Sequence, residues 1–149
     1  MSFDKVLIIC NGQPPEDQLL RLLWKEVDLR IAADGGANCL PIEEFRPDFV
    51  VGDLDSLNAE VRFGFPKNSI IHIEEQDTND ADKALRFCLD KSARTVHLLG
   101  ASGKRLDQFL ANLEVMYKYS TQMRIILWTE IERMEFISGN WKEPLPPDS

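Results

Sequence analysis

Basic residues are scarce in this sequence. Its 17 Lys and Arg residues stand against 25 Asp and Glu residues, which leaves a net charge of −8. Nucleic acids are held by clusters of Lys and Arg, so we expect no nucleic-acid partner. The same negative charge would repel a phosphorylated ligand unless a bound cation lay between the ligand and the protein.

Cysteine pairs and long apolar runs are missing as well. The three cysteines are odd in number and form no C-x-x-C pair, which favours reduced thiols in a cytoplasmic protein over a disulfide framework or a zinc site. No apolar run approaches the ~18 residues that a membrane-spanning helix needs. The N-terminus also has no basic stretch followed by a signal-type apolar stretch. We therefore expect neither export nor membrane insertion.

Short apolar runs alternate with amphipathic segments along the 149 residues. The run that follows Lys5 is apolar up to Cys10, as expected of a strand buried on both faces of a parallel sheet. Further strands are predicted at Leu29–Ala33, Phe49–Val51, Ile70–Ile73 and Thr95–Leu99. This alternation of strands and helices predicts an α/β domain with a mostly parallel sheet.

Helical spacing of apolar residues marks the segments between these strands. Pro14 and Pro15 lead into a helix with one apolar face, formed by Leu19, Leu20, Leu23, Trp24 and Val27. A short helix is expected after Ala33, and a longer one over residues 81–89, capped by Asn79 or Thr78. Residues 57–69 have the composition of a loop.

The predicted helix from Leu106 to Tyr117 precedes a change of pattern. We expect its inner face to consist of Leu106, Phe109, Leu110, Leu113 and Tyr117. After Ser120, two strand-like runs, Arg124–Trp128 and Met134–Ile137, follow without a helix between them. Such a pair is too small for an independent domain. The two runs either extend the sheet edge, pair with another chain or belong to a longer structure.

Polar residues collect directly after the predicted strands. The clusters are Asn11-Gly12, Asp34-Gly35-Gly36, Gly52 to Asp55, Gln76 to Asp80 and Gly100 to Asp107. Carboxyl ends of parallel strands meet at one edge of a sheet, where ligands of open α/β folds bind. We therefore expect a crevice lined by Asp34, Asp53, Asp55, Asp80 and Asp107. With bound Mg²⁺, a crevice this acidic would suit a polyphosphate.

The pair Asp53 and Asp55 is the clearest metal candidate. In extended backbone, residues i and i+2 point to the same side, roughly 6–7 Å apart. A solvated turn is the alternative, because Asp, Gly and Ser are also turn residues.

Basic residues and glycines near the same edge are candidates for phosphate contacts. The segment Gly100 to Arg105 leads into a helix, whose N–H groups suit phosphate oxygens, although the P-loop spacing is absent. Lys83 is expected close to Asp80, and Arg105 suits bidentate phosphate contact. Each candidate has a structural alternative: Asp34 as a turn residue, Asp80 as a first-turn helix acid, and Asp107 and Lys104 as surface charges.

Together, these segments resemble the catalytic domain of the thiamine pyrophosphokinase family over residues 5–120. The resemblance rests on Ala33 to Asn38, Gly52 to Ser56, Gln76-Asp77 with Asp80 and Lys83, and Gly103 to Gln108 with Ala111 to Leu113. The family usually has Thr directly before the aspartate matched by Asp80, whereas this chain has Asn79 there.

The resemblance implies transfer of pyrophosphate from ATP to the hydroxyl group of thiamine, with Mg²⁺ as cofactor, in a cytoplasmic homodimer. It implies the following site residues: Asp53, Asp55 and Asp80 as metal ligands; Asp34 and Asp107 as further metal partners or near the attacking hydroxyl; and Asn11, Gly12, Gly35, Gly36, Gln76, Lys83, Gly103, Lys104 and Arg105 around nucleotide and phosphate. It also implies that residues 1–121 form the ATP- and Mg-binding domain, and that residues 122–149 begin an incomplete β-sandwich for thiamine.

Two other functions fit part of the sequence. A Mg-nucleotide-binding module without catalysis would have the same carboxylates but lack the acceptor half. A phosphatase of the haloacid dehalogenase type would use Asp53 as nucleophile, and it would leave the Asp34 and Asp107 segments without a role.

Overall fold

Seven strands form one mixed sheet in this protein. The computed structural model describes residues 3–137. The strands are β1 (Lys5–Ile9), β2 (Leu29–Ala33), β3 (Phe49–Gly52), β4 (Ile70–His72), β5 (Thr95–Leu99), β6 (Arg124–Trp128) and β7 (Arg133–Met134). Their order is β4-β3-β2-β1-β5-β6-β7, with β7 antiparallel to β6 and the other pairs parallel. The expected mostly parallel α/β fold is confirmed.

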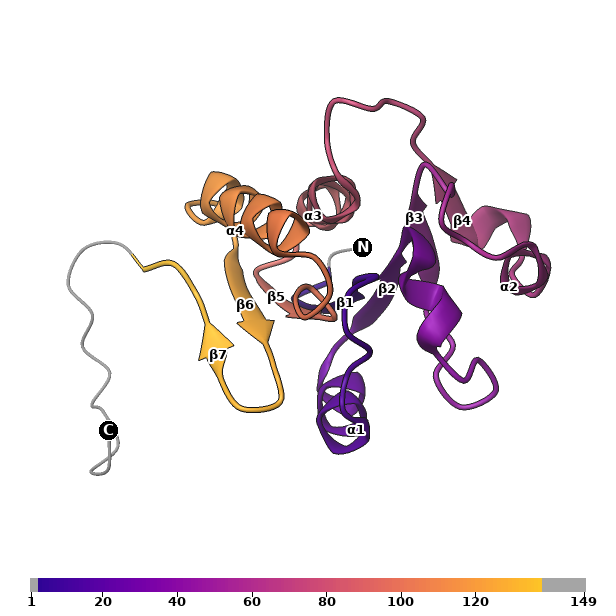
Figure 1. Ribbon diagram of the computed structural model, residues 1–149, viewed down its shortest axis with the longest axis horizontal. Coiled ribbons are helices and arrows are strands. Elements are labelled where there is room, and N and C mark those ends of the chain that lie inside the picture. Colours follow the sequence, from indigo (N-terminus) through magenta and orange to yellow (C-terminus); the bar gives the residue numbers. More distant parts are fainter. Residues whose placement is uncertain (1–2, 138–149) are drawn as a thin grey trace.

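Helices cover both faces of the sheet, as Figure 1 shows. They are α1 (Asp17–Glu26), α2 (Ala59–Phe63), α3 (Asp80–Asp90), α4 (Leu106–Tyr119) and the 3₁₀ helices η1 (Asp34–Cys39) and η2 (Lys67–Ser69). Alternate residues of β1 serve the two layers: Leu7 and Ile9 pack with α1, whereas Val6 and Ile8 pack with α3 and α4. Because both faces are covered, the apolar run of β1 has no polar alternation.

Helices α1 and α3 each begin at a capping side chain. Asn79 Oδ1 accepts a hydrogen bond from the Asp82 backbone N–H at 2.8 Å, which confirms Asn79 as the N-cap of α3. The Glu16 carboxylate accepts from the first backbone N–H groups of α1. Within residues 3–137, no helix combines the length and apolar composition needed to cross a membrane.

Two local predictions were wrong. Residues 57–69 are not a plain loop, because α2 and η2 form there, separated by Gly64 and Pro66. The predicted inner face of α4 is only partly correct: Phe109 and Leu113 pack against the core, whereas Leu106, Leu110 and Tyr117 are exposed. The buried residues of α4 are Asn112, Val115, Met116 and Tyr119. This helix carries apolar residues on two neighbouring stripes, so periodicity alone could not select the buried one.

The strand after α4 extends the main sheet. β6 pairs in parallel with β5, and β7 closes a short hairpin against it. Of the three alternatives for these runs, extension of the sheet edge is therefore the one observed. A domain boundary after residue 121 does not coincide with a break in this sheet. The strand predicted at Met134–Ile137 is observed as the shorter β7, Arg133–Met134. The Pro-rich segment Pro144–Pro147 lies outside the described residues.

Candidate active site

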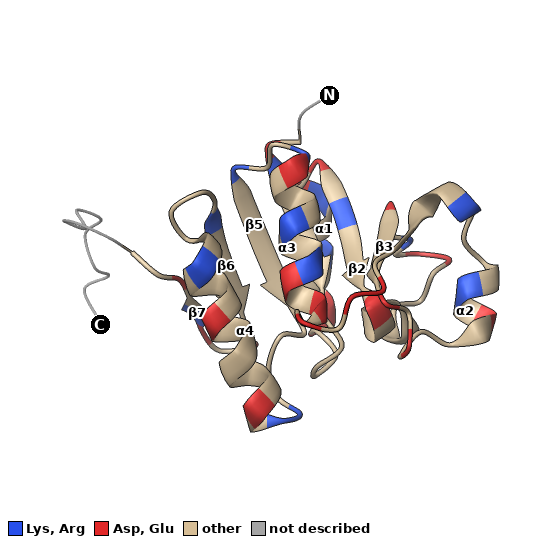
Figure 2. Cartoon of the chain, turned by 90° about the horizontal axis from the view of Figure 1, so that it is seen from above, with Lys and Arg blue, Asp and Glu red and all other residues tan. Residues whose placement is uncertain are grey.

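Three aspartates from separate segments meet at the carboxyl edge of the sheet. Asp34 follows β2, Asp53 follows β3, and Asp80 is the first residue of α3. One carboxylate oxygen from each lies within 4.8 Å of the other two, and we call these residues the carboxylate cluster. Figure 2 shows acidic residues gathered between the start of α3 and the ends of β2 and β3. Three oxygens at this spacing can share one divalent cation.

Gly52 makes this convergence possible. A Cβ atom at this position would lie 3.1 Å from Asp34 Cβ and 3.3 Å from Asp80 Oδ1. The residue also has a φ of +148°, which favours glycine. Sequence reasoning identified Gly52 only as the end of a strand, whereas its missing side chain leaves room for two carboxylates.

Asp34 is the most buried member of the cluster, with 1% of its surface exposed. Its Oδ2 accepts a hydrogen bond from the Ser56 backbone N–H at 3.3 Å. Its Oδ1 has no hydrogen-bond partner among the described residues. Burial, neighbouring Asp53 and the charge of Asp80 raise the pKa of Asp34 to about 7. Because a buried carboxylate oxygen normally has a partner, this atom fits a cation ligand.

The other two members have pKa values shifted in opposite directions. The Asp55 backbone N–H donates to Asp53 Oδ1 at 3.1 Å, and this bond is the main reason that the pKa of Asp53 is lowered. Burial, followed by the charge of Asp53, raises the pKa of Asp80. The cluster therefore contains one carboxylate that favours its charged form and two that resist charging without a cation.

Asp55 does not lie where the extended-strand argument placed it. Leu54 has a φ of +71°, so the backbone turns between the two aspartates. The exposed Asp55 contributes its N–H group to Asp53, and its carboxylate is not part of the three-residue cluster. The segment from Asp53 to Asp55 therefore forms a turn, which was the alternative to a metal site, and Asp53 also belongs to the carboxylate cluster.

A cavity of about 320 Å³ adjoins the cluster at Asp80. It extends past Asn11, Gly12 and Ser56 to the segment Gly100 to Arg105. The loops after β1 and β5 are joined here by backbone hydrogen bonds, including Gly12 N–H to Gly100 O at 2.6 Å. The strand order reverses between β1 and β5, which is where open α/β sheets bind ligands.

The predicted glycines pack closely against other chain segments. A Cβ atom on Gly36 would lie 2.1 Å from Ile9 O, and one on Gly35 would lie 2.6 Å from Asn11 Nδ2. A Cβ on Gly12 would meet Gly100 O at 2.3 Å. Packing is therefore sufficient to explain glycine at these three positions, and their contact with nucleotide stays a prediction.

The basic side of the cavity is exposed. Lys104 and Arg105 line it, whereas Gly103 and Asp107 do not. Arg105 donates to Asp107 Oδ1 at 3.0 Å and to Oδ2 at 2.5 Å. This pairing lowers the pKa of Asp107. The structure thus places Asp107 in a surface ion pair at the start of α4, outside the carboxylate cluster.

Comparison with known proteins identifies the family. The family model described as thiamin pyrophosphokinase, catalytic domain, matches residues 20–127. The chain belongs to this family. Thiamine pyrophosphokinase 1 of Oryza sativa subsp. japonica is 32% identical, in a match covering 83% of this chain and 55% of that relative. The Bacillus subtilis enzyme is 32% identical over 64% of this chain and 44% of its own length.

Solved structures of the thiamin pyrophosphokinase family have the same fold. The protein from Geobacillus thermodenitrificans superposes with a TM-score of 0.70 at 31% identity, covering 83% of this chain and 59% of that one. The Candida albicans protein gives 0.72 at 22% identity, over 85% and 58% of the two chains. The chain spans about half the length of the curated relatives that it matches.

Lys83 and Gln76 lie beside the cluster. Lys83 is 1% exposed, and its Nζ donates to Thr78 O at 2.6 Å. Its positive charge lowers the pKa of Asp53 and opposes the rise at Asp80. The Gln76 amide also lowers the pKa of Asp53 and donates to Glu74 O. Lys83 is therefore a buried counter-charge for the cluster, and its contact with phosphate stays a prediction.

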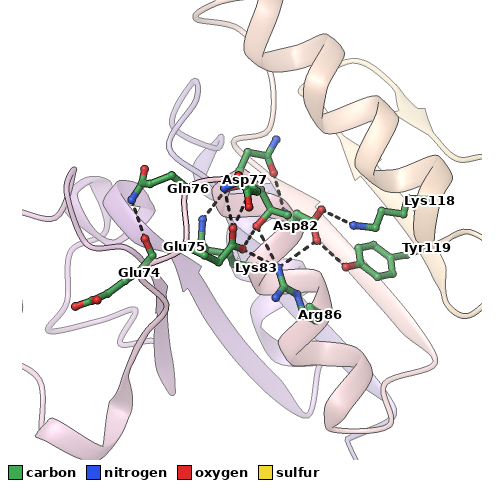
Figure 3. Close-up of polar contacts among 11 residues, drawn as sticks. Glu74, Glu75, Gln76, Asp77, Asp82, Lys83, Arg86, Lys118 and Tyr119 are labelled. Atoms are coloured by element: carbon green, nitrogen blue, oxygen red, sulfur yellow. Dashed lines mark hydrogen bonds and ion pairs between the residues drawn. The ribbon is translucent and has the colours of Figure 1, made fainter.

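Two polar residues near this site were not predicted from the sequence. Asn112, buried on α4, donates to Ala101 O at 2.9 Å and accepts from Asn79 Nδ2 at 3.3 Å. Asp82 is 4% exposed and is bonded to Tyr119 and Lys118 of α4 (Figure 3). Asn112 was part of the family resemblance without a role. Asp82 carried no signal, because its hydrogen-bond partners Lys118 and Tyr119 lie more than 30 residues away in the chain.

Proposed function

We propose that this chain transfers pyrophosphate from ATP to the hydroxyl group of thiamine and releases AMP, as a thiamine pyrophosphokinase. The observation that carries this proposal is the unpartnered, buried Asp34 Oδ1 beside Asp53 and Asp80, next to a cavity at the strand-order reversal. Membership of the family supports the same reaction.

Asp34, Asp53 and Asp80 would hold a divalent cation, which we propose to be Mg²⁺. The ion would neutralise the negative charge of the triphosphate, which is what phosphoryl-type transfer chiefly requires. The Asp55 backbone N–H, bonded to Asp53 Oδ1, keeps this ligand ionised. The role of the Asp55 carboxylate as a metal ligand stays a prediction.

Phosphate groups would lie against the basic side of the cavity. The Arg105 guanidinium, now paired with Asp107, has the planar geometry that binds two phosphate oxygens. Lys104 and the N–H groups at the start of α4 would add positive potential there. Transfer then depends on how the two sides of the cavity align the triphosphate, because positioning supplies much of such a reaction. Asp34 and Asp107 are the two candidates for the residue beside the attacking hydroxyl.

The proposal that thiamine is the acceptor depends on the related proteins. The matching segment covers 55% of the rice enzyme, so contacts to thiamine and the homodimer are carried over from the family. A Mg-nucleotide-binding module without turnover is the second candidate, favoured by that coverage. The cytoplasmic location likewise stays a prediction.

Incubation of the chain with Mg-ATP and thiamine tests the proposal. We expect AMP and thiamine diphosphate to appear together in equal amounts, as measured by ion-exchange chromatography. ADP in place of AMP would indicate a simple kinase and contradict the proposal. ATP binding by calorimetry without any AMP would favour the non-catalytic module.

Asp53→Asn and Asp90→Asn form a matched pair for this assay. Asp53 belongs to the cluster, whereas Asp90 is exposed at the end of α3. We expect the first substitution to reduce AMP formation on the order of 10²–10³-fold, because it removes a proposed ligand of the cation that would neutralise the reacting phosphates. The second should leave AMP formation unchanged.

A further inference from the structure

The loop between β4 and α3 is organised around one carboxylate. Glu75 Oε2 accepts hydrogen bonds from the backbone N–H groups of Asp77 at 2.8 Å and Thr78 at 3.1 Å. Glu75 Oε1 accepts from the Thr78 hydroxyl. This turn leads directly into Asp80, so the position of Glu75 determines how the chain enters the carboxylate cluster.

Arg86 joins this turn to helix α3. Its guanidinium donates to Glu75 Oε1 at 3.0 Å and to Thr78 Oγ1 at 3.1 Å. The same group lies 3.8 Å from Asp82 Oδ1 (Figure 3). Since Asp80 begins the helix that carries Arg86, the loop and the helix are locked together at the metal-binding end.

Asp82 in turn fixes α3 to α4. Its Oδ1 accepts from the Tyr119 hydroxyl at 2.6 Å, and its Oδ2 accepts from Lys118 Nζ at 2.8 Å. The result is a continuous path of charged contacts from α4 through Asp82 and Arg86 to Glu75. Such a path holds the loop more rigidly than its backbone alone would.

The loop between β4 and α3 also reaches Lys83 and Asp53. Its Thr78 carbonyl accepts from Lys83 Nζ at 2.6 Å. Gln76, one residue after Glu75, lies near enough to Asp53 to affect that carboxylate. Displacement of the turn would therefore move Gln76, Lys83 and Asp80 relative to Asp53.

We propose that Glu75 and Arg86 are positioning residues for the carboxylate cluster: their ion pair places Asp80 and Lys83 for binding of a divalent cation. The inference rests on the proposed function only in that the cluster binds such a cation. Neither residue belongs to the cluster, so each acts through the loop. Loss of outer contacts of this kind typically weakens metal binding about 10–100-fold.

Titration of the substrate-free chain with Mn²⁺, followed by electron paramagnetic resonance of the free ion, tests this role. Arg86→Leu is compared with Arg21→Leu, because the two side chains are similarly exposed, at 41% and 45%, and each pairs with acidic residues. We expect the Kd for Mn²⁺ to rise at least about tenfold in Arg86→Leu and to be unchanged in Arg21→Leu. Arg86→Lys retains the charge and should recover most of the affinity.

A lower melting temperature of Arg86→Leu with an unchanged Kd for Mn²⁺ would overturn the proposal, because the ion pair would then be structural only. If Arg86→Leu does not fold, Glu75→Gln decides in the same way, since it keeps the side-chain volume. Wild-type chain that binds no Mn²⁺ would overturn this inference and the metal-dependent function together. Weakened Mn²⁺ binding in Arg86→Leu, with no AMP from the wild-type chain, would support the inference and reject the proposed function.

Discussion

The acidic and basic walls of the cavity differ in how deeply their charged side chains are buried. Asp80 forms the acidic wall, and the other members of the carboxylate cluster and Lys83 lie beside it. Both Asp34 and Lys83 are 1% exposed. The basic wall consists of Lys104 and Arg105, and the Arg105 side chain is 75% exposed. One wall is embedded between β2, β3 and α3, whereas the other projects from a loop.

This difference separates two ways of binding charge. Buried carboxylates must be desolvated when the protein folds, so the folded protein holds them close together at a cost that a cation can offset. Exposed basic groups keep their hydration and lose little when they change partners. The folded chain thus brings the three carboxylates together before any ligand binds, and we expect phosphate contacts to form only when the ligand arrives. Three substitutions would test this comparison.

Removal of the buried positive charge of Lys83 should have the largest effect on stability. Lys83→Met keeps the length of the side chain but removes the bond to Thr78 O and the charge beside Asp53 and Asp80. We expect the free energy of unfolding to fall by about 3–5 kcal/mol, as when one partner is removed from a buried set of charges. Urea denaturation measures this change.

Lys67→Met is the matched control for that substitution. Lys67 is exposed in η2, so its loss should change the free energy of unfolding by less than about 0.5 kcal/mol. Equal effects of both substitutions would contradict a special role for the buried cation.

Substitution of Asp34 should have the opposite sign in the metal-free protein. In the unfolded chain Asp34 has the ordinary pKa of 3.8, whereas burial in the folded chain raises its pKa to about 7. Stability of the metal-free protein should therefore fall as the pH rises from about 4 to about 7, and stay low above that range. Asp34→Asn removes this loss and should stabilise the metal-free protein at pH 8 by at most ~4 kcal/mol, the equivalent of that pKa shift.

Addition of Mn²⁺ should make the wild-type protein more stable than Asp34→Asn at pH 8. Wild-type protein should gain stability with increasing Mn²⁺, because the ion binds only the folded state. Asp34→Asn should gain little. Thermal unfolding at pH 5 and pH 8, with and without Mn²⁺, measures both effects. The prediction fails if the two proteins respond to pH and to Mn²⁺ in the same way.

Substitution on the basic wall should have the smallest effect on stability. Arg105→Gln breaks an exposed ion pair with Asp107, which should change the free energy of unfolding by less than about 1 kcal/mol. If Arg105 contacts phosphate, the Kd for Mg-ATP should rise about tenfold, which calorimetry measures. Arg62→Gln, an exposed residue of α2, should change neither quantity. A strong loss of stability in Arg105→Gln would contradict the contrast between the walls.

Much of the fold could be predicted from local patterns. The strands β1, β2, β3 and β5 are recognisable because a strand covered on both faces has a continuous apolar run. The glycine-aspartate clusters follow these strands, so their convergence at one edge follows from parallel topology. Asp34, Asp53 and Asp80 do meet at that edge.

Other features depend on packing that no local pattern encodes. The turn at Leu54, with φ +71°, directs Asp55 away from the geometry of an extended strand. The buried stripe of α4 depends on where that helix lies on the sheet, since both stripes are apolar. The place of β6 beside β5 is likewise a choice between strand partners distant in sequence.

The sequence by itself determined the mostly parallel α/β fold and the aspartates available at the carboxyl edge, because apolar runs and turn residues are local properties of the chain. Only the tertiary structure decided which carboxylates share a site and what holds them. Gly52 admits the side chains of Asp34 and Asp80, and the path from Tyr119 through Asp82 and Arg86 secures the loop before α3. These contacts join residues far apart in the chain, so they exist only once the helices are packed on the sheet.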